Sequence, residues 1–306
     1  MSTTTPDRVS AGTPSGRLGF GARRATTTTE VVSPGTPSGR LGRGPRRPTT
    51  GPERLTSVMA HHFLVYRRTW RGSIISRFLS PLFFLLSMGL GLGALVDDSA
   101  GGVDGLPYLQ FVVPGILAMQ AMMTAFGEST YAVMGYIKWN QMYAAMLATP
   151  LRVVEVLGGH LAVVAFHLFT GALIFVVVAA PFGAFASWWV VLAVPVAVLT
   201  GLAFAVPTFA LSARLENDNG FSILFRFVVT PLMLFSGTFF PVDQLPAWMQ
   251  PLAWVTPLWH GVELSRDAST GTAPGALGLV HLGVLLLYVG VGWLLARRSF
   301  TRRLVS

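Results

Sequence analysis

The feature that most constrains the fold is the absence of charge over long parts of the chain. No Asp, Glu, Lys or Arg occurs from Val156 to Ala213, and none occurs from Thr270 to Ala296. Because a membrane-spanning helix needs about 20 mostly apolar residues, the first stretch is long enough for two spans and the second for one. A buried helix of a water-soluble protein does not need such length. The chain is therefore predicted to be an all-α polytopic membrane protein.

Six membrane-spanning helices are expected from the apolar segments. Their approximate bounds are 78–96, 109–134, 154–180, 188–211, 221–240 and 277–296. Lys and Arg favour the cytosolic side of a membrane, and only Arg266 lies in the segments assigned to the other side. The residues assigned to the cytosolic side are Arg67, Arg68, Arg71, Lys138, Arg152, Arg214, Arg297, Arg298, Arg302 and Arg303. Both termini are thus expected to be cytosolic, in a multi-pass protein of the plasma membrane.

The N-terminal 52 residues differ in composition from the rest and contain a repeat. The segment SAGTPSGRLGFGARRATTT at 10–28 returns as SPGTPSGRLGRGPRRPTTG at 33–51. A tail so poor in apolar residues cannot form a packed core, so we expect disorder over 1–52 and a transmembrane domain over 53–306. Most of the net charge of +9 comes from this tail. It either binds anionic membrane lipids or has no specific role, and nucleic acid is not an expected partner.

Residues 53–72 predict an amphipathic helix at the cytosolic membrane face, because apolar residues recur at helical spacing and three arginines follow them. His61 and His62 are adjacent there. Adjacent residues on a helix point about 100° apart, so this pair is interpreted as part of the polar face and not as a metal chelate.

The connection at 135–150, GYIKWNQMYAAMLATP, mixes apolar and polar residues between the second and third predicted spans. Its pattern predicts a short helix lying across the cytosolic face, which either docks into a soluble partner or is a plain connector. Thr149 and Pro150 are typical of an N-cap and a first-turn proline, which would open the third span. The candidate residues for contact with a partner are Lys138, Trp139, Asn140 and Tyr143.

The external stretch at 235–266, FSGTFFPVDQLPAWMQPLAWVTPLWHGVELSR, is rich in Pro and Trp and contains no run long enough to span. Short re-entrant helices are expected, one capped by Asp243 and another begun by Thr256 and Pro257. Irregular backbone at membrane depth must be buried in protein or line a wet cavity. The segment is interpreted as an external gate or, alternatively, as an interfacial loop that only packs. The candidate gate residues are Asp243, Trp248, Trp254, His260 and Glu263.

Charged residues are rare within the predicted spans. Glu128 and Arg226 lie at similar depth, about 9 Å from the expected cytosolic boundary at 1.5 Å per residue. An unpaired charge in the membrane costs several kcal/mol, so the two are expected to pair, with Arg77 as a competing partner. Such a pair is either a functional contact or a purely structural one.

Several other residues within the predicted spans have an expected structural role. His160, His167 and His281 are interpreted as interhelical hydrogen-bonding groups. Glycines in the first and sixth spans are expected to permit close helix approach. They are Gly89, Gly91, Gly93, Gly283, Gly290 and Gly292.

Motifs for catalysis are absent from the sequence. There is no phosphate-binding Gly-x-x-x-x-Gly-Lys-Ser/Thr loop, no His-Glu-x-x-His motif and no cysteine, and Lys138 is the only lysine. The chain is therefore not expected to be an enzyme or to hold a metal or cofactor. ATP hydrolysis, if it drives this protein, would need a separate subunit.

Three ordered motifs stand out along the chain, namely Tyr108–Met122 (YLQFVVPGILAMQAM), Met146–His160 (MLATPLRVVEVLGGH) and Phe235–Arg266. Together they resemble the type-2 ABC transporter permeases, especially the branch of daunorubicin-resistance and nodulation lipooligosaccharide export permeases. The resemblance covers about 250 residues and excludes the tail. It implies a six-span subunit that works as a homodimer or beside a second permease. It also implies a separate ATP-binding subunit that holds ATP and Mg, and a small amphiphilic substrate such as a drug or glycolipid.

The main alternative is a secondary transporter driven by an ion gradient. Such proteins carry repeated sets of spans and several ionisable groups at the midplane, whereas here only Glu128 and Arg226 qualify. A membrane-embedded enzyme would need polar groups clustered at one depth, and the sequence shows no such cluster. The residues do not fix the substrate, because export of an amphiphile needs only an apolar cavity or a lateral opening.

Overall fold

The computed structural model describes residues 78–79, 82–272 and 275–304, all within the unit Pro48–Ser306. Every regular element among these residues is a helix, and one isolated β-bridge joins Val103 to Leu106. The predicted tail at 1–52 and the interface helix at 53–72 lie outside the described residues, as does Arg77. The described part is therefore all-helical, as predicted.

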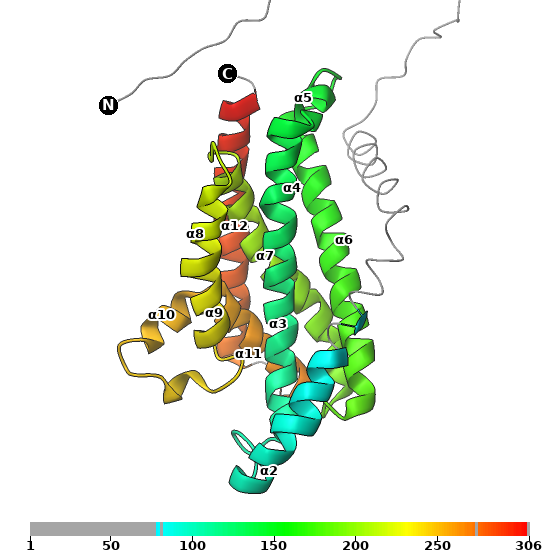
Figure 1. The fold of residues 1–306 in the computed structure, drawn as a ribbon, viewed down its shortest axis with the longest axis vertical. Helices are drawn as coiled ribbons and strands as arrows, with labels where there is room; N and C mark the ends of the chain where they lie inside the picture. Colours follow the sequence, from blue (N-terminus) through cyan, green and yellow to red (C-terminus); the bar gives the residue numbers. More distant parts are fainter. Residues whose placement is uncertain (1–77, 80–81, 273–274, 305–306) are drawn as a thin grey trace, which may run out of the picture. The chain divides into compact units, whose positions relative to one another are not determined.

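Four helices are long and apolar enough to cross a membrane. The first joins α3 (Tyr108–Ser129), α4 (Tyr131–Met134) and the π-helix η2 (Gly135–Trp139). The others are α6 (Val153–Ala179) with η3 (Ala180–Phe182), η4 (Trp188–Leu192) with α7 (Ala193–Ser212), and α12 (Ala276–Leu304). These confirm the predicted second, third, fourth and sixth spans, which lie roughly along one direction in Figure 1.

The predicted fifth span is a shorter helix than expected. It is continuous from Asn219 to Phe235 through α8 (Asn219–Leu224), the π-helix η5 (Phe225–Val229) and α9 (Thr230–Phe235). At 1.5 Å per residue its 17 residues extend about 25 Å, less than the roughly 30 Å of a hydrocarbon core. The helix ends early because the backbone turns at Gly237, whose φ is +76°.

The predicted first span is only partly described. Its last part forms the π-helix η1 (Ser87–Gly93) and α2 (Ala94–Ala100), and α2 ends at Gly101 in a left-handed conformation. Residues 82–86 are also helical and lead into η1, but this stretch is not among the four described helices that are long and apolar enough to cross a membrane. The number of six spans therefore stays a prediction.

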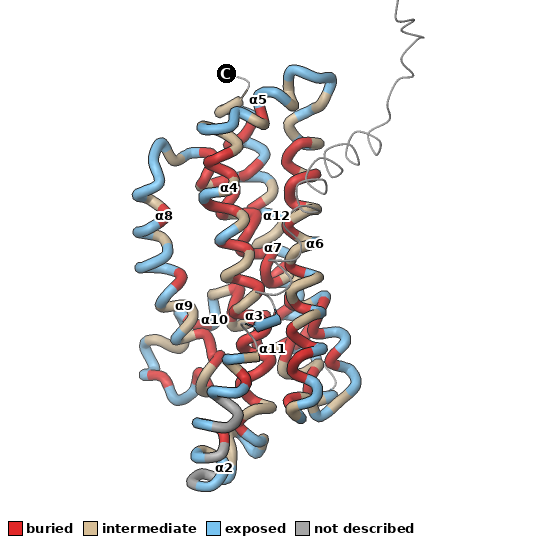
Figure 2. Tube along the Cα trace, turned by 45° about the vertical axis from the view of Figure 1, so that its right-hand side comes forward, coloured by how far each residue is buried: buried red, intermediate tan, exposed pale blue. Residues whose placement is uncertain are grey.

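The helix α7 is the centre of the packing, with α12, α3, α6 and α11 (Pro257–Thr270) around it. Buried residues follow α3 and α7 along most of their length, whereas the helix labelled α8 is largely exposed (Figure 2). Gly292 permits the close approach of α12 to α7, because a Cβ there would lie 2.8 Å from Cδ of Pro207. Gly283 and Gly290 face open space instead.

Two predicted helix starts have opposite outcomes. Thr256 does cap α11, since its hydroxyl accepts a hydrogen bond from the backbone N–H of Trp259 at 3.5 Å, and Pro257 is the first helical residue. The predicted start at Thr149 is wrong, because the Thr149 hydroxyl donates to the carbonyl of Met146 at the end of α5 (Met142–Leu147). The third span begins at Val153 instead.

The later start of α6 has a local cause. The backbone N–H of Arg152 donates to Oε2 of Glu155 at 2.8 Å, and this bond satisfies a group that the first helical turn leaves unpaired. Arg152 itself is extended, with φ −95° and ψ 153°. The acidic residue within the first turn therefore decides where the helix begins.

Candidate functional site

One end of the bundle carries the predicted contact surface for a soluble partner. The span that begins with α3 ends in η2, where the N–H of Asn140 donates to the carbonyl of Gly135 at 2.8 Å. The chain then reverses at Gln141, which has a φ of +45°, and enters α5 at the end of the bundle near the C-terminal end of α12 (Figure 1). Trp139 is 65% exposed there and Asn140 is also exposed, whereas Lys138 is half-buried.

Tyr143, the fourth predicted contact residue, is fully buried. Its hydroxyl lies 2.6 Å from Nδ1 of His160 on α6, and its ring packs edge-to-face on Phe300 of α12 at 5.6 Å. Tyr143 therefore does not face a partner from this position. It ties α5 to two spans, and His160 is the residue that sequence reasoning missed as its hydrogen-bonding partner.

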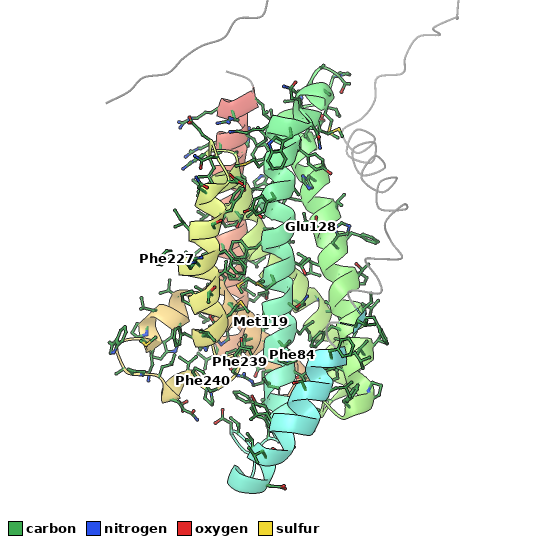
Figure 3. All side chains as sticks on the ribbon, viewed as in Figure 1. Phe84, Met119, Glu128, Phe227, Phe239 and Phe240 are labelled. Carbon is green, nitrogen blue, oxygen red and sulfur yellow. The ribbon has the colours of Figure 1, made fainter. Side chains whose placement is uncertain are left out.

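The predicted pair of Glu128 and Arg226 is not formed among the described residues. Oε1 of Glu128 instead lies 2.9 Å from Nδ1 of His167 on α6. Figure 3 shows Glu128 on the α6 side of α3, whereas Phe227, the neighbour of Arg226, lies on the opposite side. Equal depth, on which the predicted pair rested, does not determine which way a side chain points around the helix axis.

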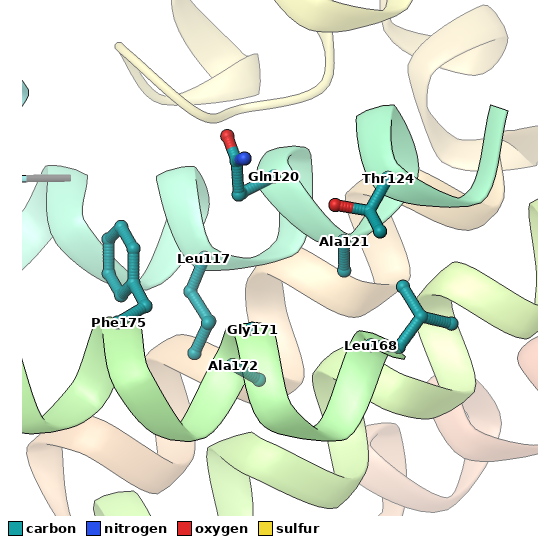
Figure 4. Close-up of a pocket in the computed structure, with 8 residues that line it drawn as sticks. All are labelled: Leu117, Gln120, Ala121, Thr124, Leu168, Gly171, Ala172 and Phe175. Atoms are coloured by element: carbon teal, nitrogen blue, oxygen red, sulfur yellow. The ribbon is translucent and has the colours of Figure 1, made fainter. Parts of the chain in front are cut away.

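A small pocket lies next to the Glu128–His167 pair, between α3 and α6 (Figure 4). Its polar lining comes from Gln120 and Thr124, about two and one helical turns before Glu128, and Gly171 lines the α6 side. The cavity volume is about 20 Å³, which is room for about one water molecule. In this conformation the pocket is too small for an organic substrate.

The opposite end of the bundle holds the predicted gate, where His260 is buried between two elements. Nε2 of His260 lies 2.8 Å from the carbonyl oxygen of Trp254, at the end of α10 (Gln250–Val255), and Nδ1 lies 2.7 Å from Nδ1 of His281 on α12. A carbonyl only accepts, so Nε2 donates, and neutral His281 must donate to His260. Burial lowers the pKa of His260, and His281 adds to this effect. His260 therefore links α10 and α12 through its two ring nitrogens.

A second buried cluster surrounds Arg266 on α11. Nη1 of Arg266 donates to Oε1 of Glu263 at 2.8 Å, and Nη2 donates to the carbonyl of Gly237 at 2.8 Å. The guanidinium also lies 4.0 Å from the ring centre of Phe111 on α3, within cation–π range. Burial raises the pKa of Glu263, and the charge of Arg266 opposes that rise. Arg266 thus joins α11 to α3 and to the loop after α9, a role that the sequence did not reveal.

The other predicted gate residues do not belong to these clusters. Trp248 is 71% exposed and Asp243 is also exposed. Asp243 does not cap a helix as predicted, since Pro241 is the N-cap of the short 3-10 turn η6 (Val242–Gln244). The structure therefore places His260 and Glu263 in these clusters, with Trp254 contributing only its backbone carbonyl, and leaves the side chains of Trp254, Asp243 and Trp248 exposed.

A larger cavity of about 300 Å³ opens between α7, α12 and the helix Asn219–Phe235. Its lining is apolar apart from three hydroxyl groups, and each of these donates to a backbone carbonyl. Thr208 donates to Phe204 at 2.7 Å, Thr256 to Ala253 at 2.8 Å, and Tyr288 to Val255 at 2.9 Å. With its own donors engaged, the cavity suits a hydrocarbon chain better than a sugar or an ion.

Over the described ranges, no three potential metal ligands come together.

Comparison with known proteins agrees with this arrangement. Residues 53–269 match the profile described as ABC-2 type transporter. The chain is 33% identical over 250 residues to nodulation protein J of Rhizobium leguminosarum bv. viciae, covering 81% of this chain and 94% of that protein. It is 32% identical over 256 residues to nodulation protein J of Sinorhizobium fredii, covering 83% and 95%. It is also 24% identical over 239 residues to the inner membrane transport permease YadH of Escherichia coli, covering 77% and 90%. The chain therefore belongs to the ABC-2 type transporter family.

Proposed function

We propose that this membrane subunit of an ABC transporter is a permease that exports an amphiphilic molecule, either a drug or a lipid-linked sugar. The family match, and the relatives that align over most of their length, support a transport subunit. The observation that carries the substrate class is the apolar cavity of about 300 Å³ beside α7 and α12, whose hydroxyl groups are all engaged by the protein itself. A chain of hydrocarbon fits such a lining, and a free sugar does not.

The proposed motor is a separate ATP-binding subunit that holds ATP and Mg. Trp139 and Asn140 form the proposed contact, because they are exposed at the tip of the bundle where the chain reverses. Tyr143 would carry force from that tip into α6 and α12 through His160 and Phe300. Two copies of this chain, or this chain and a second permease, would form the transport path.

The proposed orientation places this tip in the cytosol. Lys138 and Arg152 flank α5, and Arg214 reaches the C-terminal end of α12, where its Nε donates to Oγ of Ser299 at 2.9 Å. Such clustering of positive charge at one end favours the cytosolic side. The gate clusters around His260 and Arg266 would then lie at the outer face of the plasma membrane.

A secondary transporter driven by an ion gradient is the competing function. The pair of Glu128 and His167 favours it, because an acid and a histidine in contact within a span are typical of proton relays. In the permease interpretation the same pair is a structural link between α3 and α6.

Transport in inside-out membrane vesicles separates the two. We expect uptake of a fluorescent amphiphile to require ATP, to stop when the partner ATPase is inactivated, and to continue when an uncoupler removes the proton gradient. Affinity purification of the full chain in mild detergent should recover an ATPase in about equal amount. Uptake that follows the proton gradient without ATP would overturn the proposal and make Glu128 the coupling site.

A further inference from the structure

A second cavity of about 300 Å³ lies at the gate end of the bundle, apart from the one beside α12. One wall is formed by Trp189, Leu192 and Val196, which are three and four residues apart and so share one face of the helix that begins with η4. The facing wall comes from α11, with Leu264 and Asp267 one turn apart. Two helix faces therefore enclose an apolar space with one acidic group.

The walls of this cavity are held together by the backbone. The N–H groups of Ala186 and Ser187, just before η4, both donate to the carbonyl of Ser269 on α11 at 3.0 Å. Gly271 lines the cavity, and a Cβ there would lie 2.7 Å from Oγ of Ser187, so the two segments are in close contact. The relative position of η4 and α11, and with it the shape of the cavity, is thus fixed by these hydrogen bonds and this close contact.

The charge in the cavity is negative, and no cationic side chain from the described part of the chain lines the cavity beside it. Among the described residues, Asp267 makes no salt bridge within 4.0 Å, and its carboxylate accepts no hydrogen bond. The adjacent Arg266 is engaged by Glu263 and by the carbonyl of Gly237. The Thr272 hydroxyl, the other polar group of the lining, is hydrogen-bonded to the hydroxyl of Thr270 at 2.8 Å. A cationic ligand would neutralise the carboxylate of Asp267, and one with an N–H group would also donate a hydrogen bond to it.

The aromatic part of the wall suits the same charge. The ring of Trp189 is stacked on that of Trp188, with centres 4.2 Å apart and planes 27° apart. Indole is the best side-chain partner for an ammonium group, which it attracts through the electrons of its ring face. From Trp189 to Val196 the apolar wall continues for about 10 Å along the helix at 1.5 Å per residue. A ligand therefore has room for a hydrocarbon chain beside its charged group.

We propose that this cavity binds the ammonium group and first methylenes of a monocationic amphiphile that enters from the membrane. The carboxylate of Asp267 would hold the charge, Trp189 would cover it, and Leu192, Val196 and Leu264 would contact the chain. An anionic amphiphile is disfavoured because the cavity presents a carboxylate and no cation of its own. The site is separate from the proposed substrate cavity, and it does not depend on ATP-driven export.

The test is photolabelling of the purified full chain in maltoside detergent, whose micelles are uncharged. Three decyl probes carry the same diazirine in the chain and end in trimethylammonium, in sulfate or in a hydroxyl group. We expect the ammonium probe to label peptides around Leu192 and Leu264. Unlabelled decyltrimethylammonium should compete with this labelling at least tenfold better than decyl sulfate. Equal competition by the sulfate would overturn the proposal, and this wild-type comparison needs no variant.

Substitutions then assign the charge contact. Asp267→Asn keeps the size of the side chain and removes its charge, so affinity for the ammonium probe should fall about tenfold, while labelling by the hydroxyl probe stays unchanged. Asp218→Asn, an exposed acidic residue just before α8, is the matched control and should bind both probes like wild type. Trp189→Leu should weaken binding of the ammonium probe and leave binding of the hydroxyl probe unchanged. Unchanged ammonium binding in Asp267→Asn would contradict the assignment.

Discussion

Single atoms decide how closely α12 approaches α7. A Cβ at Gly292 would lie within 2.9 Å of the ring and backbone nitrogen of Pro207, whereas a Cβ at Gly290 would have no neighbour within 4 Å. Proline cannot move its ring away by changing rotamer, because the ring is closed on the backbone. Gly292 is therefore needed for the close approach of α12 to α7, whereas Gly290 is not.

Substitution of these glycines should separate the two roles. Gly292→Ala is expected to lower the free energy of unfolding by about 1–3 kcal/mol through overpacking. Gly290→Ala should leave it unchanged or raise it by up to about 1 kcal/mol through helix propensity. Thermal unfolding in detergent measures both. Equal stability of the two variants would show that α12 and α7 are not in contact at Pro207.

The charge of Asp267 makes ammonium binding depend on pH. Burial raises the pKa of Asp267 above its ordinary value of about 4, and the adjacent Arg266 opposes that rise. The carboxylate binds a cation only when it is ionised, so affinity for the ammonium probe should be highest above this raised pKa and should fall as pH decreases through it. Binding of the hydroxyl probe should not change over the same range. An ammonium affinity that rises on acidification would contradict the role of this group.

Which side chains of two helices meet depends on the helix faces that point toward each other. Glu128 of α3 contacts His167 of α6 because both lie on such facing sides. A double-mutant cycle with Glu128→Gln and His167→Gln should give a coupling free energy of about 1–2 kcal/mol in thermal unfolding. A parallel cycle with Glu128→Gln and Arg226→Gln should be additive, because these two groups form no salt bridge among the described residues. Coupling in the second cycle alone would restore the pair that was expected from depth.

The elements differ in how far the sequence predicts them. Four spans were predictable because a long uncharged run such as Val156–Ala213 must satisfy its backbone hydrogen bonds within the membrane, and helices do so whatever their neighbours are. The end of the helix at Phe235 and the N-cap of α6 at Arg152 were missed, because they depend on one turning glycine and one side-chain acceptor at Glu155.

The residues of the candidate sites were less predictable than the spans. Trp139 is exposed, as a contact residue must be, whereas Tyr143 is buried. A mixed apolar and polar pattern does not tell which of the two aromatic residues is buried. The pairing of His260 with His281 joins residues 21 positions apart through two helices, and no local pattern encodes it. Arg266 was noted only as a charge on the outer side, because its partners come from three separate elements.

At the scale of the whole molecule, the proposed ATP-driven transport requires force to pass from the tip of the bundle to the opposite end. Trp139→Ala is expected to lower ATP-driven transport and the stimulation of ATPase activity several-fold, with membrane insertion and melting temperature unchanged. Trp188→Ala, a similarly exposed tryptophan at the other end, is the matched control and should keep normal coupling. Normal coupling in the Trp139 variant would move the contact elsewhere on the tip.

Tyr143→Phe tests the second step of that path. The variant keeps the ring contacts with Phe300 and loses the hydrogen bond to His160, so stability should fall by about 1 kcal/mol. Transport should fall with it if α5 moves together with α6. Thermal unfolding and vesicle transport, measured on the same preparation, provide the two readouts. A loss of stability with full transport would make Tyr143 a purely structural residue.

The π-helical turns at Ser87–Gly93, Gly135–Trp139 and Phe225–Val229 bear on how this permease can be recombined with its relatives. A π-turn holds one residue more than an α-turn, and one residue corresponds to a rotation of about 100° about the helix axis. A chimera joined inside such a turn with one residue too few would present the following half-helix with the wrong face to its neighbours. Crossover points belong in the loops on either side, with the full length of each turn taken from a single parent.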